Sequence, residues 1–194
     1  MAMPLPAQLH LTLPIWVLEL DVSGRDFSTD AAKVGFAIEL SRRNLEMRSG
    51  GPFGAAIFDA NDRLIAIGVN RVLPQSCSLA HAETMACMLA QQRLQRTRLN
   101  RDADGNASGS ITLATSSQPC CQCYGATVWA GIDRLLIGAR AEDVMELTEF
   151  DEGPLPADWI GELNARGIEV VRNIQRDAAR AVLRAYGESG GARY

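Results

Sequence analysis

The sequence predicts an α/β protein with a three-layer α/β/α arrangement around a mixed, five-stranded sheet. Short β-rich runs alternate with longer segments of helical periodicity, which is the order expected of βαβ units and a parallel half-sheet. The first two β-rich runs are instead separated by four residues of turn-forming character, which indicates a hairpin. A chain of 194 residues is long enough for one such domain and too short for two ordinary ones.

The first half of the chain is expected to hold a helix, the hairpin and a second helix. Ser28 or Thr29 can cap a helix that runs to about Met47, and the glycines and proline of residues 49–52 stop it. The remaining elements of this half are the strands Phe53–Phe58 and Leu64–Val69, their turn at 59–62, a helix over 78–95 and an exposed polar loop over 98–110.

The second half continues with three strands and four helices. The first three of these elements are a strand, a helix and a strand, the order of a βαβ unit. The expected strands cover residues 111–115, 134–138 and 168–171, and the expected helices cover residues 121–130, 142–150, 157–164 and 177–186.

The domain organisation is predicted to be a single catalytic domain of residues 1–194. Within it, residues 1–27 form an N-terminal arm or strand, residues 28–174 the core, and residues 175–194 a terminal helix and tail. The apolar stretch Leu11–Leu20 contains Pro14 and Glu19, follows no basic segment and is too short to cross a bilayer. We therefore interpret it as a buried arm or strand and expect no membrane association.

Composition and charge narrow the class of partner. The net charge is -4, whereas proteins that bind nucleic acid usually gather Lys and Arg on one face. A small-molecule substrate is favoured over RNA or DNA. The five cysteines are an odd number and three of them fall within four positions, which suits a metal and a reducing compartment better than disulfides. We expect a cytoplasmic protein.

Two short motifs carry the chemistry: His81-Ala82-Glu83 at a helix start, and Pro119-Cys120-Cys121-Gln122-Cys123 between a strand and a helix. Cys120 and Cys123 lie one helical turn apart and can present both sulfurs to one metal, while the helix N-terminus favours thiolates. His81 would supply a third ligand from a second helix. Together the motifs match the H-x-E…P-C-x-x-C signature of zinc-dependent deaminases.

The ligand count indicates catalysis. Structural zinc sites use four protein ligands, whereas three ligands leave a position for a water molecule whose pKa zinc lowers to roughly 7. We therefore expect one zinc ion per chain, with Glu83 as the general base and acid. The alternatives are a redox-active CxxC pair, a closed structural site completed by Cys121, and His81 as a simple helix cap.

Beyond the motifs, the chain from Gly50 onward resembles the guanine deaminase branch of the cytidine deaminase superfamily. The resemblance rests on the segment Gly51-Pro52-Phe53-Gly54-Ala55, on Asn70 upstream of the histidine, on Trp129 after the cysteines, on Phe150-Asp151-Glu152 and on the terminal Tyr194. It implies a cytidine deaminase-like fold. It also implies that the substrate-binding residues are Asn70, Phe53, Ala55, Ala82, Trp129 and Tyr194.

The resemblance further implies a second proton shuttle. In this branch an acid of the Phe-acid-acid segment has that role, which corresponds here to Asp151 or Glu152, while Glu146 and Glu149 are nearby alternatives. Such an acid needs a pKa raised toward neutrality by burial or by a neighbouring carboxylate.

The implied activity is hydrolytic deamination of a free nucleobase, with guanine converted to xanthine and ammonia, and possible activity on aminated triazines such as ammeline. Cytosine, adenosine (in tRNA) or pterin deamination are alternatives, as is a catalytically silent zinc-binding interaction module. Glu83 is needed for proton transfer and not for holding zinc, so its presence argues against a silent module. Relatives also imply a homodimer in which the C-terminal segment, with Tyr194, can exchange between subunits to cover the partner's pocket.

Overall fold

The computed structural model describes residue 5 and residues 7–192 of the chain. Its sheet has the strand order β2-β1-β3-β4-β5, and β2, β1 and β3 pair antiparallel while β3, β4 and β5 pair parallel. The mixed five-stranded sheet predicted from the sequence is confirmed. The strands are β1 (Gly54–Phe58), β2 (Leu64–Val69), β3 (Thr112–Ser117), β4 (Arg134–Ala139) and β5 (Glu169–Val171).

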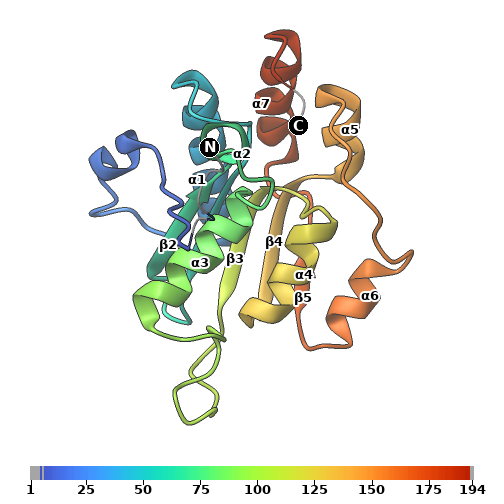
Figure 1. The fold of residues 1–194 in the computed structure, drawn as a ribbon. Helices are drawn as coiled ribbons and strands as arrows, with labels where there is room; N and C mark the ends of the chain where they lie inside the picture. The colour runs from blue at the N-terminus through green and yellow to red at the C-terminus, as the bar shows by residue number, and fades with distance from the viewer. Residues whose placement is uncertain (1–4, 6, 193–194) are drawn as a thin grey trace.

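Helices cover both faces of the sheet (Figure 1). One face packs against α1 (Asp30–Glu46) and α7 (Arg176–Glu188), and α5 (Ala141–Thr148) lies beside α7. The other face packs against α3 (Ala82–Leu94), α4 (Cys121–Ala130) and α6 (Trp159–Asn164). Because residues alternate along each strand, neighbouring side chains such as Ala55 and Ala56 enter the two different cores.

The approach of α3 to the sheet depends on a glycine in β2. A Cβ atom on Gly68 would lie 2.0 Å from the carbonyl oxygen of Ala82, so no side chain fits between the strand and the first turn of the helix. This close packing sets the position of α3. It therefore also sets the positions of His81, which directly precedes the helix, and of Glu83 in its first turn.

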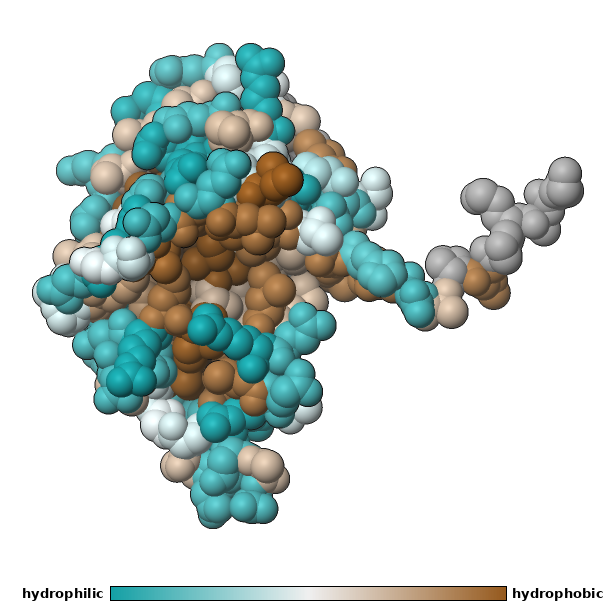
Figure 2. Space-filling view, turned by 90° about the vertical axis from the view of Figure 1, so that its left-hand side faces the viewer, coloured by the Kyte–Doolittle hydropathy of each residue, from teal (hydrophilic) through white to brown (hydrophobic). Residues whose placement is uncertain are grey.

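Among its described residues, 5 and 7–27, the N-terminal arm contains no strand. Residues Ile15–Glu19 form a 3-10 helix, η1, because Pro14 lacks the backbone donor that a sheet ladder would need. Only part of the arm is buried: Trp16 is 2% exposed, whereas Leu18 is 85% exposed. Figure 2 views a side of the molecule where a hydrophobic band crosses between polar regions.

The helix expected to begin at residue 78 begins instead at Ala82. A short helix, α2 (Val72–Gln75), precedes it and ends at Ser76, whose backbone is left-handed with φ 47°. The N–H of Arg71 then donates to the carbonyl oxygen of Ala80 at 2.8 Å. This bond closes a compact loop and brings the end of β2 next to His81. None of the helices within residues 7–192 has the length and apolar character that crossing a bilayer requires.

Candidate active site

Three metal-binding side chains converge where α3 and α4 begin. His81 directly precedes α3, Cys120 directly precedes α4, and Cys123 lies in the first turn of α4. The Nδ1 atom of His81 lies 3.4 Å from the Cys120 sulfur and 3.6 Å from the Cys123 sulfur. Zinc bonds of about 2.3 Å to sulfur and 2.0 Å to nitrogen at tetrahedral angles would separate these atoms by about 3.5 Å. The donor set and its spacing therefore fit one zinc ion, as expected.

The charges in this cluster suit a cation. A hydrogen bond from Cys123 and another from His81 outweigh burial and lower the pKa of Cys120 to about 4. Burial lowers the pKa of His81, but its bond to Cys120 and the Glu83 charge raise it overall. A lowered thiol pKa favours the thiolate, which is the form that binds zinc.

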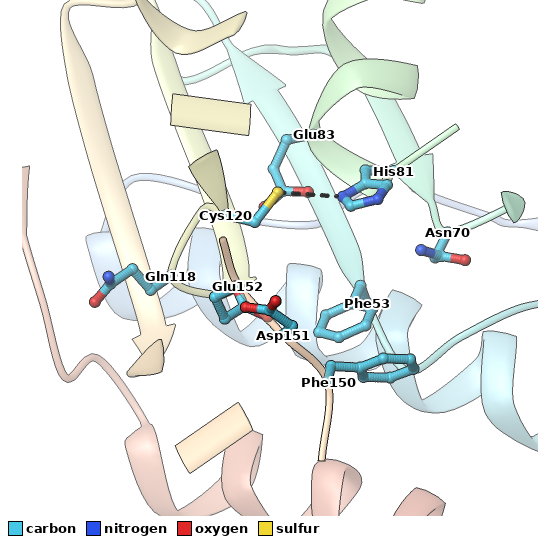
Figure 3. Close-up of a pocket in the computed structure, with 9 residues that line it drawn as sticks. All are labelled: Phe53, Asn70, His81, Glu83, Gln118, Cys120, Phe150, Asp151 and Glu152. Carbon is cyan, nitrogen blue, oxygen red and sulfur yellow. Dashed lines mark hydrogen bonds between the residues drawn. The ribbon is translucent and has the colours of Figure 1, made fainter. Parts of the chain in front are cut away.

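Glu83 lies beside the cluster without belonging to it. Its side chain is buried, and its two carboxylate oxygens accept hydrogen bonds from Thr115 Oγ1 and from the Cys123 thiol, each at 3.4 Å. Burial, and then the negative charge of Cys120, raise its pKa. In Figure 3 the Glu83 side chain points toward the same part of the pocket as the Cys120 sulfur and the His81 ring, which a dashed line joins. A carboxyl group with this position and pKa can take up and return a proton.

The cluster opens into a pocket (Figure 3). Its wall is formed by segments from both halves of the chain, including the end of β2, the end of β3 and the segment after α5. The lining residues are Phe53, Asn70, His81, Glu83, Gln118, Cys120, Phe150, Asp151 and Glu152.

Asn70 is buried and its amide is oriented by the backbone. The Oδ1 atom accepts hydrogen bonds from the N–H of Gly51 at 3.3 Å and from the N–H of Val72 at 3.2 Å. Both bonds fix the side-chain oxygen on the protein side, and Figure 3 shows the amide nitrogen on the pocket side. The residue therefore offers the pocket a hydrogen-bond donor.

The acidic segment after α5 is held in a turn. Asp151 Oδ1 accepts the N–H of Gly153 at 2.9 Å, and the Cys121 N–H donates to the carbonyl oxygen of Glu152 at 3.0 Å. Burial, followed by the negative charges of Cys120 and Glu83, raises the pKa of Glu152 to about 8. Of the four acids considered from the sequence, Glu152 combines a position in the pocket with a pKa near neutrality.

Several predicted site residues lie elsewhere. Trp129 is 76% exposed and lines a separate apolar groove on α3 and α4, because its position on α4 points away from the pocket. It does not contact the pocket of its own chain. Glu146 pairs with Arg180 on the outer side of α5, and Glu149 lines a different surface. Ala55 and Ala82 are fully buried core residues, and Tyr194 lies outside the described residues.

Two lining residues were not proposed as site residues from the sequence. Gln118 lies at the carboxyl end of β3, two positions before Cys120, and is 6% exposed. Its proximity to the cysteine motif is the signal that could have identified it. Phe150 packs against Phe53 with ring centroids 5.6 Å apart, and only the fold shows that these two rings meet.

With this geometry defined, comparison with known proteins identifies the family. The model of the cytidine and deoxycytidylate deaminase zinc-binding region matches residues 28–139, which include all three metal-binding residues and Glu83. The chain belongs to this deaminase family. The matched region is a zinc-binding region, so the family assignment confirms that the metal site is a zinc site.

Individual relatives within the family carry more than one substrate name. A solved structure of guanine deaminase from Nitrosomonas europaea is 41% identical, with a TM-score of 0.86 over 96% of this chain and 100% of that chain. A probable cytosine deaminase from Schizosaccharomyces pombe is 36% identical over 66% of this deaminase and 74% of its own length. The guanine deaminase of Bacillus subtilis is 32% identical over 60% and 67%.

Proposed function

We propose that this deaminase hydrolyses guanine to xanthine and ammonia. The observation that carries the proposal is the meeting of Asn70, Glu83 and Glu152 in one pocket beside the zinc ligands. The choice of guanine is supported by the similarity to the Nitrosomonas enzyme, which extends over nearly the whole of both chains, including the segment with Glu152.

The proposed roles follow from the positions of the side chains. His81, Cys120 and Cys123 would hold zinc, which when bound supplies a water molecule of lowered pKa as the nucleophile. Glu83 takes the proton from that nucleophile as it attacks the amine-bearing carbon, and returns it to the adjacent ring nitrogen. Glu152, protonated near neutral pH, gives a proton to the departing amine, and the proton that the added hydroxyl group loses as the product carbonyl forms restores the Glu152 carboxyl group. Water is consumed and ammonia is released.

Binding of the ring is assigned to the remaining lining residues. The Asn70 amide nitrogen can donate to an acceptor on the ring edge, and its bonds to Gly51 and Val72 keep the donor in place. Phe53 and Phe150 form an apolar wall with ring centroids 5.6 Å apart, against which a planar base can pack. Gln118 also lines the pocket, but Figure 3 shows its side-chain amide directed away from the other lining residues.

The test is ammonia release from a panel of guanine, cytosine, adenine, ammeline, cytidine and guanosine by purified protein whose zinc content has been measured. We expect turnover of guanine with about one zinc ion per chain, the stoichiometry of a three-ligand site. Turnover confined to another ring would contradict guanine as the substrate. Absence of turnover on every ring despite bound zinc would favour a silent zinc-binding module.

Cytosine deamination is the second candidate, since the Schizosaccharomyces relative is a probable cytosine deaminase with 36% identity. Its match covers 66% of the chain, less than the 96% covered by the Nitrosomonas structure. The substrate panel distinguishes the two candidates, because it contains both bases. Variant Glu152→Gln then tests the second acid on the base that the enzyme deaminates. A severe loss of kcat on guanine supports the proposed role of Glu152.

Assembly and location are also proposals. We propose a homodimer that buries the apolar groove around Trp129 and Leu79, which are 76% and 59% exposed, because monomers rarely expose such surfaces. Sedimentation of wild type and Trp129→Glu tests this proposal.

Exchange of the C-terminal segment stays a prediction. Up to Ala192 the tail lies on its own α7, where the Tyr186 hydroxyl donates to the carbonyl oxygen of Ala192 at 2.5 Å. Zinc binding by reduced thiolates supports a cytoplasmic location.

A further inference from the structure

We propose that the N-terminal arm, residues 11–20, is a positioning element of the substrate pocket and acts on Asn70 through Trp16, Ser49 and Asn44. The proposal rests on the proposed function in that Asn70 is taken as a substrate-binding residue. None of the three intermediate side chains lines the pocket, so each is a positioning residue and not a catalytic one.

A continuous chain of hydrogen bonds leads from the arm to the pocket. The indole Nε1 of Trp16 donates to Ser49 Oγ at 2.9 Å, and that hydroxyl lies 2.7 Å from Asn44 Oδ1, to which it donates. The Asn44 amide nitrogen then donates to the carbonyl oxygens of Gly51 at 2.8 Å and of Asn70 at 3.0 Å. The last two acceptors belong to the backbone segments that shape the Asn70 side of the pocket.

Asn44 therefore joins two loops that Asn70 itself also joins. Its amide bridges the Gly51 and Asn70 carbonyl groups, while the Asn70 side chain accepts the Gly51 N–H at 3.3 Å. The loops are in close contact: a Cβ on Gly50, whose φ is 157°, would lie 1.8 Å from the Asn70 carbonyl oxygen. With both loops fixed in this way, the Asn70 amide is oriented before any ligand arrives.

A second link connects the arm with the same loops. Arg71, which follows Asn70, donates from Nε to the carbonyl oxygen of Thr12 at 3.1 Å and from Nη1 to the carbonyl oxygen of Ser49. The Trp16 indole is held from its other side by the Arg43 guanidinium, 5.0 Å from the ring centroid. The arm thus contacts both loops that Asn44 joins. Trp16 bonds to Ser49 in the first loop, and Thr12 accepts from Arg71 in the second.

The energetic role of such an arrangement is preorganisation. A donor that is already fixed loses little conformational freedom when a ligand binds, so the ligand binds more tightly without any added contact. Loosening the loops should weaken binding of the ring. It should not affect the zinc ligands and Glu83, which lie at the starts of α3 and α4. The expected signature is a rise in KM with little change in kcat.

The experiment compares Trp16→Phe, which keeps an aromatic ring but removes the indole donor, with Ser49→Ala and its conservative partner Ser49→Thr. Trp159→Phe is the matched control, because Trp159 lies on α6 and takes no part in this chain of bonds. We measure kcat and KM for guanine, the Kd of the guanine analogue 8-azaguanine, and zinc content. Trp16→Phe and Ser49→Ala should raise KM and Kd about fivefold, the effect of about one hydrogen bond. Ser49→Thr and Trp159→Phe should stay near wild type.

Unchanged KM and Kd in both Trp16→Phe and Ser49→Ala, or equal changes in Trp159→Phe, would overturn the proposal. Wild type that neither deaminates guanine nor binds 8-azaguanine would contradict the proposed function instead. In that case amide hydrogen exchange, which needs no substrate, tests whether Ser49 holds the two loops in position. Faster exchange of the Gly51 and Val72 N–H groups in Ser49→Ala than in Trp159→Phe supports it, and equal exchange contradicts it.

Discussion

The backbone N–H of Cys121 donates a 3.0 Å hydrogen bond to the carbonyl oxygen of Glu152. Cys121 lies between the two cysteine ligands at the start of α4, so this bond joins the helix that carries both sulfurs to the segment that carries the second acid. The two proton-transfer groups proposed here, Glu83 and Glu152, both line the same pocket, together with the zinc ligands His81 and Cys120.

Substitution Glu83→Gln should lower kcat severely while leaving zinc content and thermal stability near wild type. The amide keeps the volume and can still accept from Thr115, but it cannot take up a proton. We expect kcat to fall by about 10²- to 10⁴-fold, the usual contribution of a general acid–base group. Steady-state ammonia release, metal analysis and a thermal melt check this. Loss of zinc in the variant would instead identify Glu83 as a ligand.

The two acids of the turn should respond differently. Glu152→Gln removes the proposed proton donor and should lower kcat by about 10²- to 10⁴-fold. Asp151→Asn keeps an oxygen that can accept the Gly153 N–H, so its kcat should fall far less. Comparing kcat for the two variants on the same substrate decides between them. The reverse ranking would assign the shuttle role to Asp151.

Substitution of a zinc ligand should change zinc content, activity and melting temperature, whereas substitution of the nearby Cys121 should not. Cys123→Ser should lose zinc and activity, and its melting temperature should fall because metal binding no longer stabilises the folded state. Cys121→Ser should retain both, since the Cys121 side chain is exposed and its structural contact is through the backbone N–H. Chelation of wild-type zinc should reproduce the Cys123→Ser melt. Equal metal loss in both variants would place Cys121 among the ligands.

The sequence was sufficient for the metal site and for the sheet. Spacing alone placed Cys120 and Cys123 on one helical turn, and apolar runs located all five strands to within two residues at most ends. The wrong expectations involve tertiary context. Trp129 was expected in the pocket and is exposed, because short-range pattern does not show which face of α4 meets the sheet.

Irregular backbone was the other source of error. The start of α3 was expected at residue 78, and the left-handed Ser76 and the Arg71–Ala80 bond that delay it have no signature in hydrophobic periodicity. The choice of Glu152 among the candidate acids also needed the fold, since its raised pKa depends on burial and on Cys120 and Glu83, which are distant in sequence.

A buried carboxylate away from the pocket, Asp143, is paired with two partly exposed arginines and predicts a pH-dependent stability. Asp143 accepts hydrogen bonds from Arg176 and Arg180, and although burial opposes ionisation, these partners lower its pKa to about 2. Because the folded-state pKa is below the unfolded value of 3.8, the stabilisation is complete above that value and is lost as pH falls toward 2.

The corresponding variant is Asp143→Asn, assayed by urea unfolding in a chelator so that zinc loss at low pH affects both proteins equally. We expect it to be about 2 kcal/mol less stable than wild type at pH 7, the range for hydrogen bonds to charged groups. The difference should shrink as pH falls below about 4. A difference that stays constant between pH 7 and pH 3 would show that ionisation of Asp143 is not its source.

Gly153 tests the link between α4 and the acidic turn. Its φ is 67°, and an added Cβ would lie 2.5 Å from the Cys121 sulfur. Gly153→Ala should therefore lower stability by about 1–2 kcal/mol through the left-handed backbone alone, and the clash should displace Glu152 and reduce kcat. Cys121→Ala removes the clashing sulfur, so the double variant should recover part of the lost kcat but none of the backbone strain. If the effects of the two substitutions on kcat are strictly additive in a double-mutant cycle, the clash with the Cys121 sulfur is not what displaces Glu152.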